Sequence, residues 1–511
     1  MHTMLEKSIR GGISTITRRF AAANNRYCPN YNRNRDPTFL AYLDKNNLYG
    51  WAMTQFMPKG AFEWMPDDEI ENFMEKDFLQ IGEENPKGYI LEVDLEYPQS
   101  LHDKHNDFPL APESLTITPE MLSPFQNKYY PHSYQEKSVK LTPNLFDKKN
   151  YVCHYRNLQF YLNQGMKLTK THRILSFDQS SWLRTYIEFN TEKRKGSASK
   201  YAKDFFKLMN NGFYGKTQEN VRHRMRVKIV HEKAAALKEI AKANFKRSLN
   251  IREDLTIIHS ATSILRLYKP IYLGFSVLDL SKLNMYQFHY DTMLKWYPDA
   301  ELAFMDTDSF LYKIKTQNLY SDLRMSDKND EFDFSEFPEG KDGHYLYNDR
   351  NKKRMGKMKD ELHGRILREF VGLRPKCYSI LFDGIVVKNK ITKKNVVKSW
   401  ERGEKRKSKG VSKNIVQRFL RHDHYKKVHR QLGSVVVRQN KFASTNHHLK
   451  TVHQRKIALT AFDVKRWVRG DNIRTYAHGH YRTRPTNDVA LASSSPAAPV
   501  PSAHCPVPHL G

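Results

Sequence analysis

The chain has 511 residues, and its 85 Lys and Arg exceed its 55 Asp and Glu to give a net charge of +30. Aromatic residues, at 12%, can support a packed core and exclude a disordered chain, while 23 Gly and four Cys exclude collagen-like and disulfide-rich classes. The excess charge predicts an anionic partner, with nucleic acid the first candidate and an acidic membrane surface the second. No apolar run reaches the roughly 18 residues of a membrane span, so we expect no membrane insertion.

The first 25 residues hold Arg10, Arg18 and Arg19 with one acid, Glu6. This composition fits a mitochondrial presequence or the start of the fold. Residues 38–49 read TFLAYLDKNNLY, which predicts a strand that ends at an acid and a turn. A carboxylate at that strand end is a candidate metal ligand, and the alternative is an ordinary turn acid.

Residues 193–214 predict one helix with an apolar stripe and several lysines on its surface. Within it, Lys207 and Asn211 are spaced to share a helix face. A lysine there can hold a triphosphate, and the Tyr214-Gly215 pair offers a ring beside open space for a base. The alternative is a solvent-exposed lysine on an amphipathic helix.

A second helix is predicted over 281–297, with Ser281 as its N-cap and an end before Pro298. It is followed by a predicted β-hairpin over 302–315, LAFM-DTDS-FLYKIK. Asp306 and Asp308 lie at its tip, where two close carboxylates repel each other unless a cation neutralises them. Hard oxygen ligands suit Mg²⁺, and the alternative is a solvated polar turn.

Residues 388–430 contain sixteen Lys and Arg against three acids, with apolar residues interspersed. This mixture favours a folded, phosphate-facing surface over a solvated loop. Residues 490–511 lack charged side chains and are rich in Ser, Ala and Pro, so a disordered tail is predicted there.

Three of these segments and one further downstream, in this order, resemble motifs of the family B DNA polymerases. Residues 44–49 resemble DxxSLYP, 207–215 resemble KxxxNSxYG, 304–309 resemble YxDTDS, and 376–378 resemble KxY. The closest subgroup is the protein-primed, viral and organellar type, as in Polinton/Maverick-like DNA transposons. Residues 8–12 also resemble the YxGG linker, with Ile9 in place of the tyrosine. Because only 43 residues precede Asp44, we expect a truncated copy without the 3′–5′ exonuclease domain.

The resemblance implies an α+β fold, a right-handed palm–fingers–thumb polymerase with an antiparallel palm sheet and insertions. The implied divisions are palm at 1–57 and 263–378, an insertion at 58–179, fingers at 180–222, a second insertion at 223–262, a basic thumb and duplex grip at 379–481 and a tail at 482–511.

The resemblance also assigns roles residue by residue. Asp44 and Asp308 would hold two Mg²⁺ ions, with Asp306 as the supporting catalytic carboxylate. The implied nucleotide-binding residues are Tyr49, which would exclude a 2′-OH, and Lys195, Lys203, Lys207, Asn211, Tyr214 and Gly215. The implied DNA-binding residues are Arg10, Gly11, Gly12, Lys376, Tyr378, Lys405, Arg406, Lys407 and Lys409.

The implied partners are a DNA template-primer, deoxynucleoside triphosphates and a priming terminal protein, which would contact the 58–179 insertion. Two other functions stay open at this point, a catalytically inactive DNA-binding relic of a mobile element and a metal-dependent nuclease. The implied compartment is the nucleus for a transposon polymerase, or the mitochondrion for a linear-plasmid relative.

Overall fold

The structure is a computed structural model and describes residues 1–130, 139–339, 344–388, 398–445 and 447–483. Over these residues, its largest element is a ten-stranded sheet in which neighbouring strands run antiparallel except β15 and β16. The main path is β1 (Ser14–Ile16), β13 (Glu301–Asp306), β14 (Ser309–Lys315), β3 (Thr38–Lys45), β17 (Leu367–Arg374), β18 (Cys377–Lys388) and β19 (Lys398–Ser408). Beside it lie β2 (Phe20–Ala22), β15 (Phe332–Asp333) and β16 (Met358–Asp360). The expected α+β class with an antiparallel central sheet is therefore confirmed.

The predicted hairpin forms as β13 and β14, and its turn is shorter than expected because Asp306 and Ser309 still belong to the strands. The predicted strand before Asp44 forms as β3 and pairs with β14. These strands are short, nearly continuous apolar runs bounded by polar turn residues, a pattern typical of strands that are buried on both faces.

The helix predicted over 281–297 starts elsewhere. Helix α10 (Ile271–Gln287) begins after Pro270 and continues through a π-helical turn (Phe288–Met293) into α11 (Leu294–Trp296). Ser281 is therefore not an N-cap: it lies inside the helix, where its hydroxyl donates to the carbonyl of Val277 at 2.6 Å. Because α10 is buried on almost every side, it has no polar face that marks its start. The expected end before Pro298 is confirmed.

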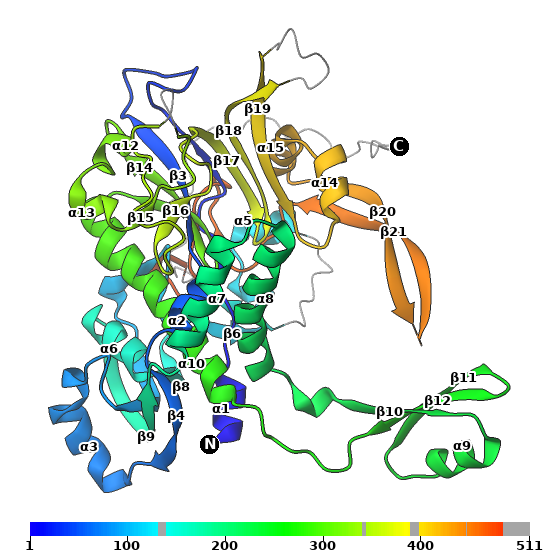
Figure 1. The fold of residues 1–511 in the computed structure, drawn as a ribbon. Coiled ribbons are helices and arrows are strands. Elements are labelled where there is room, and N and C mark those ends of the chain that lie inside the picture. The colour runs from blue at the N-terminus through cyan, green and yellow to red at the C-terminus, as the bar shows by residue number, and fades with distance from the viewer. Residues whose placement is uncertain (131–138, 340–343, 389–397, 446, 484–511) are drawn as a thin grey trace.

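Four strands of the 58–179 segment form a separate layer beside α10 (Figure 1). The middle of the segment packs instead against residues 463–478, as when Gln126 donates to the carbonyl of Asp463 at 2.9 Å. The sheet of the layer has the order β4 (Met57–Trp64), β9 (Lys167–Ser180), β5 (Lys87–Glu96) and β8 (Lys148–His154). The helices and short strands of this part are α3 (Asp67–Lys76), α4 (His102–His105), β6 (Glu113–Leu115), α5 (Pro124–Tyr129), β7 (Lys140–Thr142) and α6 (Tyr155–Asn163).

The helix predicted over 193–214 is two helices. Helix α7 (Arg184–Gly196) ends before an extended Ser197, and α8 (Lys200–Thr217) begins after Ser199, whose hydroxyl accepts a backbone N–H at 3.1 Å. A glycine followed by serines breaks the helix because Gly destabilises helix interiors and Ser favours caps. Lys195 consequently lies on a different helix from the other predicted triphosphate lysines.

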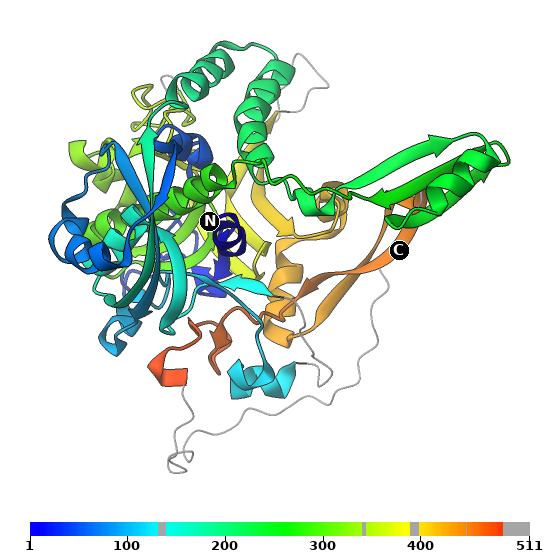
Figure 2. The same ribbon diagram turned by 90° about the horizontal axis from the view of Figure 1, so that it is seen from below.

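Two long arms extend from the molecule on the same side (Figure 2). One is the sheet β10 (Met225–Val230), β12 (Leu255–Ala261) and β11 (Phe245–Arg252) with helix α9 (Lys233–Ile240). The other is the hairpin of β20 (Ser434–Thr445) and β21 (His448–Thr460). The arms meet where ring nitrogens of His259 and His447 lie 2.7 Å apart.

The remaining elements are short. They are α1 (His2–Ser8), α2 (Leu48–Met53), α12 (Leu319–Asp322), α13 (Ser326–Asn329), α14 (Lys413–Phe419), α15 (His422–Gln431), β22 (Trp467–Val468), β23 (Thr475–Tyr476) and the 3₁₀ turns Phe78–Gln80, Gln99–Leu101, Pro119–Met121, Val221–His223 and Tyr481–Thr483. Within the described ranges, no helix has the length and apolar character needed to cross a membrane. Part of the predicted basic segment, 389–397, and the tail from residue 484 lie outside the described residues.

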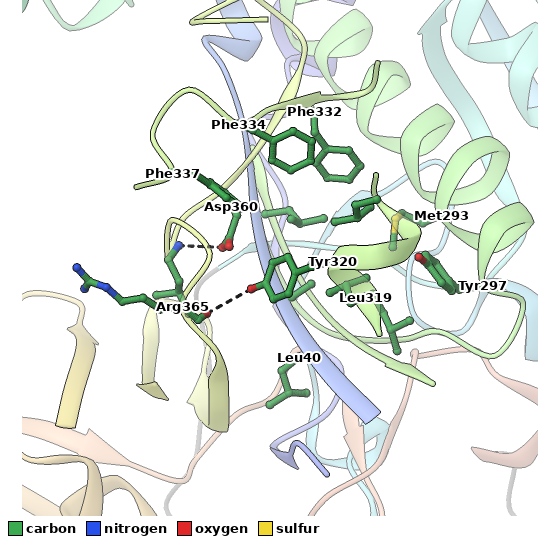
Figure 3. Close-up of a pocket in the computed structure, with 15 residues that line it drawn as sticks. Leu40, Met293, Tyr297, Leu319, Tyr320, Phe332, Phe334, Phe337, Asp360 and Arg365 are labelled. Atoms are coloured by element: carbon green, nitrogen blue, oxygen red, sulfur yellow. Dashed lines mark hydrogen bonds between the residues drawn. The ribbon is translucent and has the colours of Figure 1, made fainter. Parts of the chain in front are cut away.

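A small closed cavity lies behind β3 and β14 (Figure 3). Its volume of about 20 Å³ has room for about one water molecule. The lining is mostly apolar, and its polar groups are already paired: Tyr320 donates to the carbonyl of Arg365 at 3.4 Å, and Asp360 accepts from the N–H of Leu362 at 2.9 Å. This cavity is part of the core that supports the sheet from behind.

Candidate active site

Asp44 and Asp308 come together at one end of the central sheet. Asp44 is the penultimate residue of β3, and Ser309, the first residue of β14, lies directly opposite it. The N–H of Lys45 donates to the carbonyl of Asp308 at 2.7 Å, which fixes the turn against the end of β3. This register brings Asp44 to the tip of the hairpin.

Burial and neighbouring acids raise the pKa of both carboxylates. Burial raises the pKa of Asp44 to about 7, and the nearby charge of Asp308 adds to this effect. Burial also raises the pKa of Asp308, and the charge of Asp306 contributes in the same direction. The nearest compensation for Asp44 is Lys359, whose Nζ lies at 3.4 Å and which stands opposite Asp44 on β16. The site therefore concentrates negative charge that one lysine only partly offsets.

The donor chemistry of this pair fits Mg²⁺. Magnesium prefers hard oxygen ligands and is commonly bound by one or two carboxylates together with substrate phosphates and water. Among the described residues, no group of three or more His, Cys, Asp or Glu side chains is arranged to hold a metal ion by itself. Asp44 and Asp308 would therefore be the protein's share of a site that a phosphate-bearing substrate completes.

Asp306 has a different partner. Its carboxylate accepts from Nζ of Lys376 at 2.5 Å, and Lys376 lies in the tight turn between β17 and β18 with φ +62°. The lysine of the 376–378 motif is thus tied to the hairpin rather than to Asp44. This contact brings two motifs, separated by about seventy residues, to one edge of the sheet.

The segment before β1 supports the hairpin turn. Thr307 adopts a left-handed φ of +66°, and its N–H donates to the carbonyl of Ile13 at 2.7 Å. A Cβ on Gly12 would lie 2.4 Å from Oγ1 of Thr307, whereas a Cβ on Gly11 would meet nothing within 4 Å. Gly12 is therefore required for the close approach of this segment to the β13–β14 turn.

Arg10 is used inside the protein. Its guanidinium donates to the carbonyl of Val152 at 2.8 Å and lies 3.9 Å from the centre of the Tyr151 ring. The sequence assigned Arg10 to DNA, but these contacts direct its charge into the 58–179 layer. Gly11 and Gly12, in contrast, are exposed beside the turn.

Tyr378 lies under the site and not on its surface. Only 3% of the residue is exposed, and its hydroxyl is 3.2 Å from that of Tyr42. Its ring packs on Phe304 at 4.6 Å, and burial raises its pKa to about 12. In this conformation, Tyr378 positions the strands that carry Asp44 and Asp306.

Tyr49 and Tyr214 form an aromatic pair near Asp308. Tyr49 follows the turn at Asn47, which adopts φ +45°, and its ring centre lies 4.6 Å from that of Tyr214 on α8. Burial raises the pKa of Tyr49, and the charge of Asp308 raises it further, so the ring stands near the hairpin tip. Asn211 and Gly215 are exposed on the same helix.

The cations that the sequence predicts to bind nucleotide or DNA differ in whether an acid already pairs with them. Lys195 is 2.8 Å from Glu192, Lys405 is 2.5 Å from Glu361, and Arg406 pairs with Glu404 at 2.9 Å. In contrast, Lys207, Lys407 and Lys409 are exposed, and Lys203 is half-buried. Sequence reasoning missed several charged residues near the site, because none belongs to a motif and only tertiary packing brings them there. They are Arg194, Lys353, Lys359 and Glu361.

No protein-family model and no curated protein matches this chain. Among solved structures, it is similar to Phi29 DNA polymerase complexed with primer-template DNA and incoming nucleotides, at 12% identity and a TM-score of 0.48 over 89% of this chain. An orthorhombic crystal form of Phi29 DNA polymerase gives 13% identity and a TM-score of 0.49 over 90%. The chain spans 62% of the length of these proteins, so its function has to be argued from its own residues.

Proposed function

We propose that this chain is a template-directed DNA polymerase that adds deoxynucleotides to a 3′-OH. The observation that supports it is the convergence of Asp44, near the end of β3, with Asp308, in the turn before β14, close to the Tyr49–Tyr214 pair. Two carboxylates that a single lysine only partly offsets, beside an aromatic pair, suit a substrate with both phosphates and a planar base. The net charge of +30 suits a polyanionic second substrate.

Each residue then has a physical task. Bound Mg²⁺, in the two-ion arrangement, would neutralise the charge that develops on the attacking and leaving oxygens. Asp44 and Asp308 hold the cations, and Lys376 fixes Asp306 and offers a positive charge beside the primer end. Tyr49 packs under the incoming sugar. Because phosphoryl transfer depends mainly on positioning and charge, no nucleophilic side chain is needed.

The finer proposals rest on the motifs of the sequence. We assign the central sheet to the palm, α7 and α8 to the fingers, and the basic region after residue 379 to the thumb. We further propose protein-primed initiation, with the 58–179 layer contacting the priming protein. We also propose that the protein comes from a mobile element or a virus-like replicon and that it works in the nucleus or the mitochondrion.

Primer extension with purified protein tests the proposal. Asp308→Ala should abolish extension with DNA affinity within a few-fold, because the affinity comes mainly from Lys and Arg. Asp299→Ala, at an exposed acid before β13, is the matched control and should extend normally. Shortened rather than lengthened primers would favour the nuclease, and DNA binding without extension in the wild type would favour the inactive relic.

A further inference from the structure

A loop that follows β15 is fixed to the turn after Asp44. The N–H of Gly356 donates to the carbonyl of Asn46 at 2.9 Å, and the N–H of Asn46 donates to the carbonyl of Lys357 at 2.9 Å. The buried Nζ of Lys45 donates to the carbonyl of Gly356 at 2.8 Å. Residues 353–357 therefore keep a constant position relative to the candidate active site.

Lys353 is held at the start of this loop. Its N–H donates to Oδ2 of Asp333 at 2.7 Å, and the same oxygen accepts from Nδ2 of Asn46 at 2.7 Å. On its other side the loop meets α7, where the hydroxyl of Thr191 lies 3.7 Å from the sulfur of Met355. Lys353 thus lies at the junction of the Asp44 turn with the two helices assigned to the fingers.

Three cations from three elements gather at this junction. Partial burial lowers the pKa of Lys353, the nearby charges of Lys203 on α8 and Arg194 on α7 lower it further, and Glu336 is the acid that opposes them. Within the described ranges, none of the three cations has a carboxylate within 4.0 Å. Gathering like charges costs free energy unless an anion completes the group. A multiply charged anion suits the junction best.

We propose that Lys353 binds the triphosphate of the incoming nucleotide together with Lys203 and Arg194, an inference that rests on the proposed polymerase function. Because Lys353 belongs to a loop fixed beside Asp44 and the other two cations belong to α7 and α8, one triphosphate bridges both sides of the site. Ammonium and guanidinium groups form charge-assisted hydrogen bonds to phosphate oxygens. The β- and γ-phosphates are the natural ligands, because the α-phosphate must lie at Asp44 and Asp308.

Lys353→Gln tests this assignment, with Lys352→Gln as the matched control. Lys352 is the exposed neighbour, pairs with Asp349 at 3.1 Å, and its charge is the weakest of those that act on the pKa of Lys353. In single-nucleotide addition, Lys353→Gln should raise KM for the deoxynucleotide about tenfold with kcat within about threefold, since it removes one charged contact. Lys352→Gln should stay within about twofold, and Lys353→Arg should recover most of the loss.

An equilibrium measurement separates this inference from the polymerase proposal. Deoxynucleotide is titrated into the complex of the full chain with a dideoxy-terminated primer-template, and the Kd should rise about tenfold in Lys353→Gln. An unchanged Kd and KM would overturn the assignment. A loss of primer-template affinity equal to the loss of nucleotide affinity would also overturn it, because Lys353 would then contact DNA. If the wild type adds no nucleotide yet Lys353→Gln weakens nucleotide binding in the titration, the polymerase proposal fails and the triphosphate site stands.

Discussion

Asp44 shows at the scale of one residue how a functional site lowers stability. Its folded pKa of about 7 lies above the ordinary value of 3.8, so the folded protein binds an extra proton between these values. Its contribution to stability therefore falls as the pH rises through this window and stays low above pH 7. In the metal-free protein at pH 8, Asp44→Asn should raise stability by roughly 2 kcal/mol, discounted because 23% of the side chain is exposed.

Denaturant midpoints in EDTA at pH 8 and pH 5 check this expectation. The advantage of Asp44→Asn should shrink at pH 5, where the wild-type carboxyl is protonated. Mg²⁺ should stabilise the wild type more than the variant, and the variant should not extend primers. Equal midpoints for both proteins at pH 8 would mean that the Asp44–Asp308 repulsion is relieved by other groups.

Tyr49 carries a second prediction at this scale. Its ring is fixed against Tyr214. The ring therefore has little freedom to move away from an incoming sugar packed above it. Tyr49→Ala should therefore raise the kcat/KM for ribonucleotides relative to deoxynucleotides by about tenfold or more. Tyr49→Phe keeps the ring and should leave the ratio near that of the wild type. An unchanged ratio in Tyr49→Ala would make Tyr49 a packing residue.

The β13–β14 hairpin and the strand before Asp44 could be predicted from the sequence because short apolar runs and turn residues are local signals. The start of α10 could not, because a fully buried helix lacks a polar face. The pairing of Ser14 with Asp306 and of Lys359 with Asp44 depends on register between distant segments. Such contacts form through tertiary packing, which no local pattern in one sequence reports.

Gly12 links two elements and supports a prediction of its own. Gly12→Ala would force its Cβ against Thr307 and displace the β13–β14 turn, so kcat should fall about 10- to 100-fold while DNA affinity changes little. Gly11→Ala, with open space around its Cβ, should behave as the wild type in the same primer-extension assay.

A compensating change distinguishes this overlap from general damage. Thr307→Gly removes the side chain that the added methyl group at position 12 would meet, and glycine suits the left-handed φ of +66°. Adding Thr307→Gly to Gly12→Ala should therefore recover much of the lost kcat. If the double variant is no better than the single one, the fit between these two segments does not position the turn.

At the scale of the whole molecule, the charge of +30 is divided between paired and unpaired cations. Lys405 and Arg406 are balanced by Glu361 and Glu404, although the sequence groups them with Lys407 and Lys409. Lys407 and Lys409 are exposed on either side of Ser408, and the N–H of Lys409 donates to the carbonyl of Lys376 at 3.1 Å. The exposed pair therefore lies next to Lys376, the lysine that we propose to contact the primer end.

Neutralising this exposed pair should alter the salt dependence of DNA binding. Each lysine that contacts a phosphate adds about 0.9 to the slope of log affinity against log salt. Lys407→Gln with Lys409→Gln should therefore flatten the slope by up to about 1.8 units. The double variant should also shorten extension products more than it slows the first addition, because Asp44 and Asp308 are untouched.

Lys405→Gln, which removes a charge already paired with Glu361, is the control and should leave the slope nearly unchanged. A wild-type slope and product length in the double variant would mean that DNA does not run along this edge of the sheet.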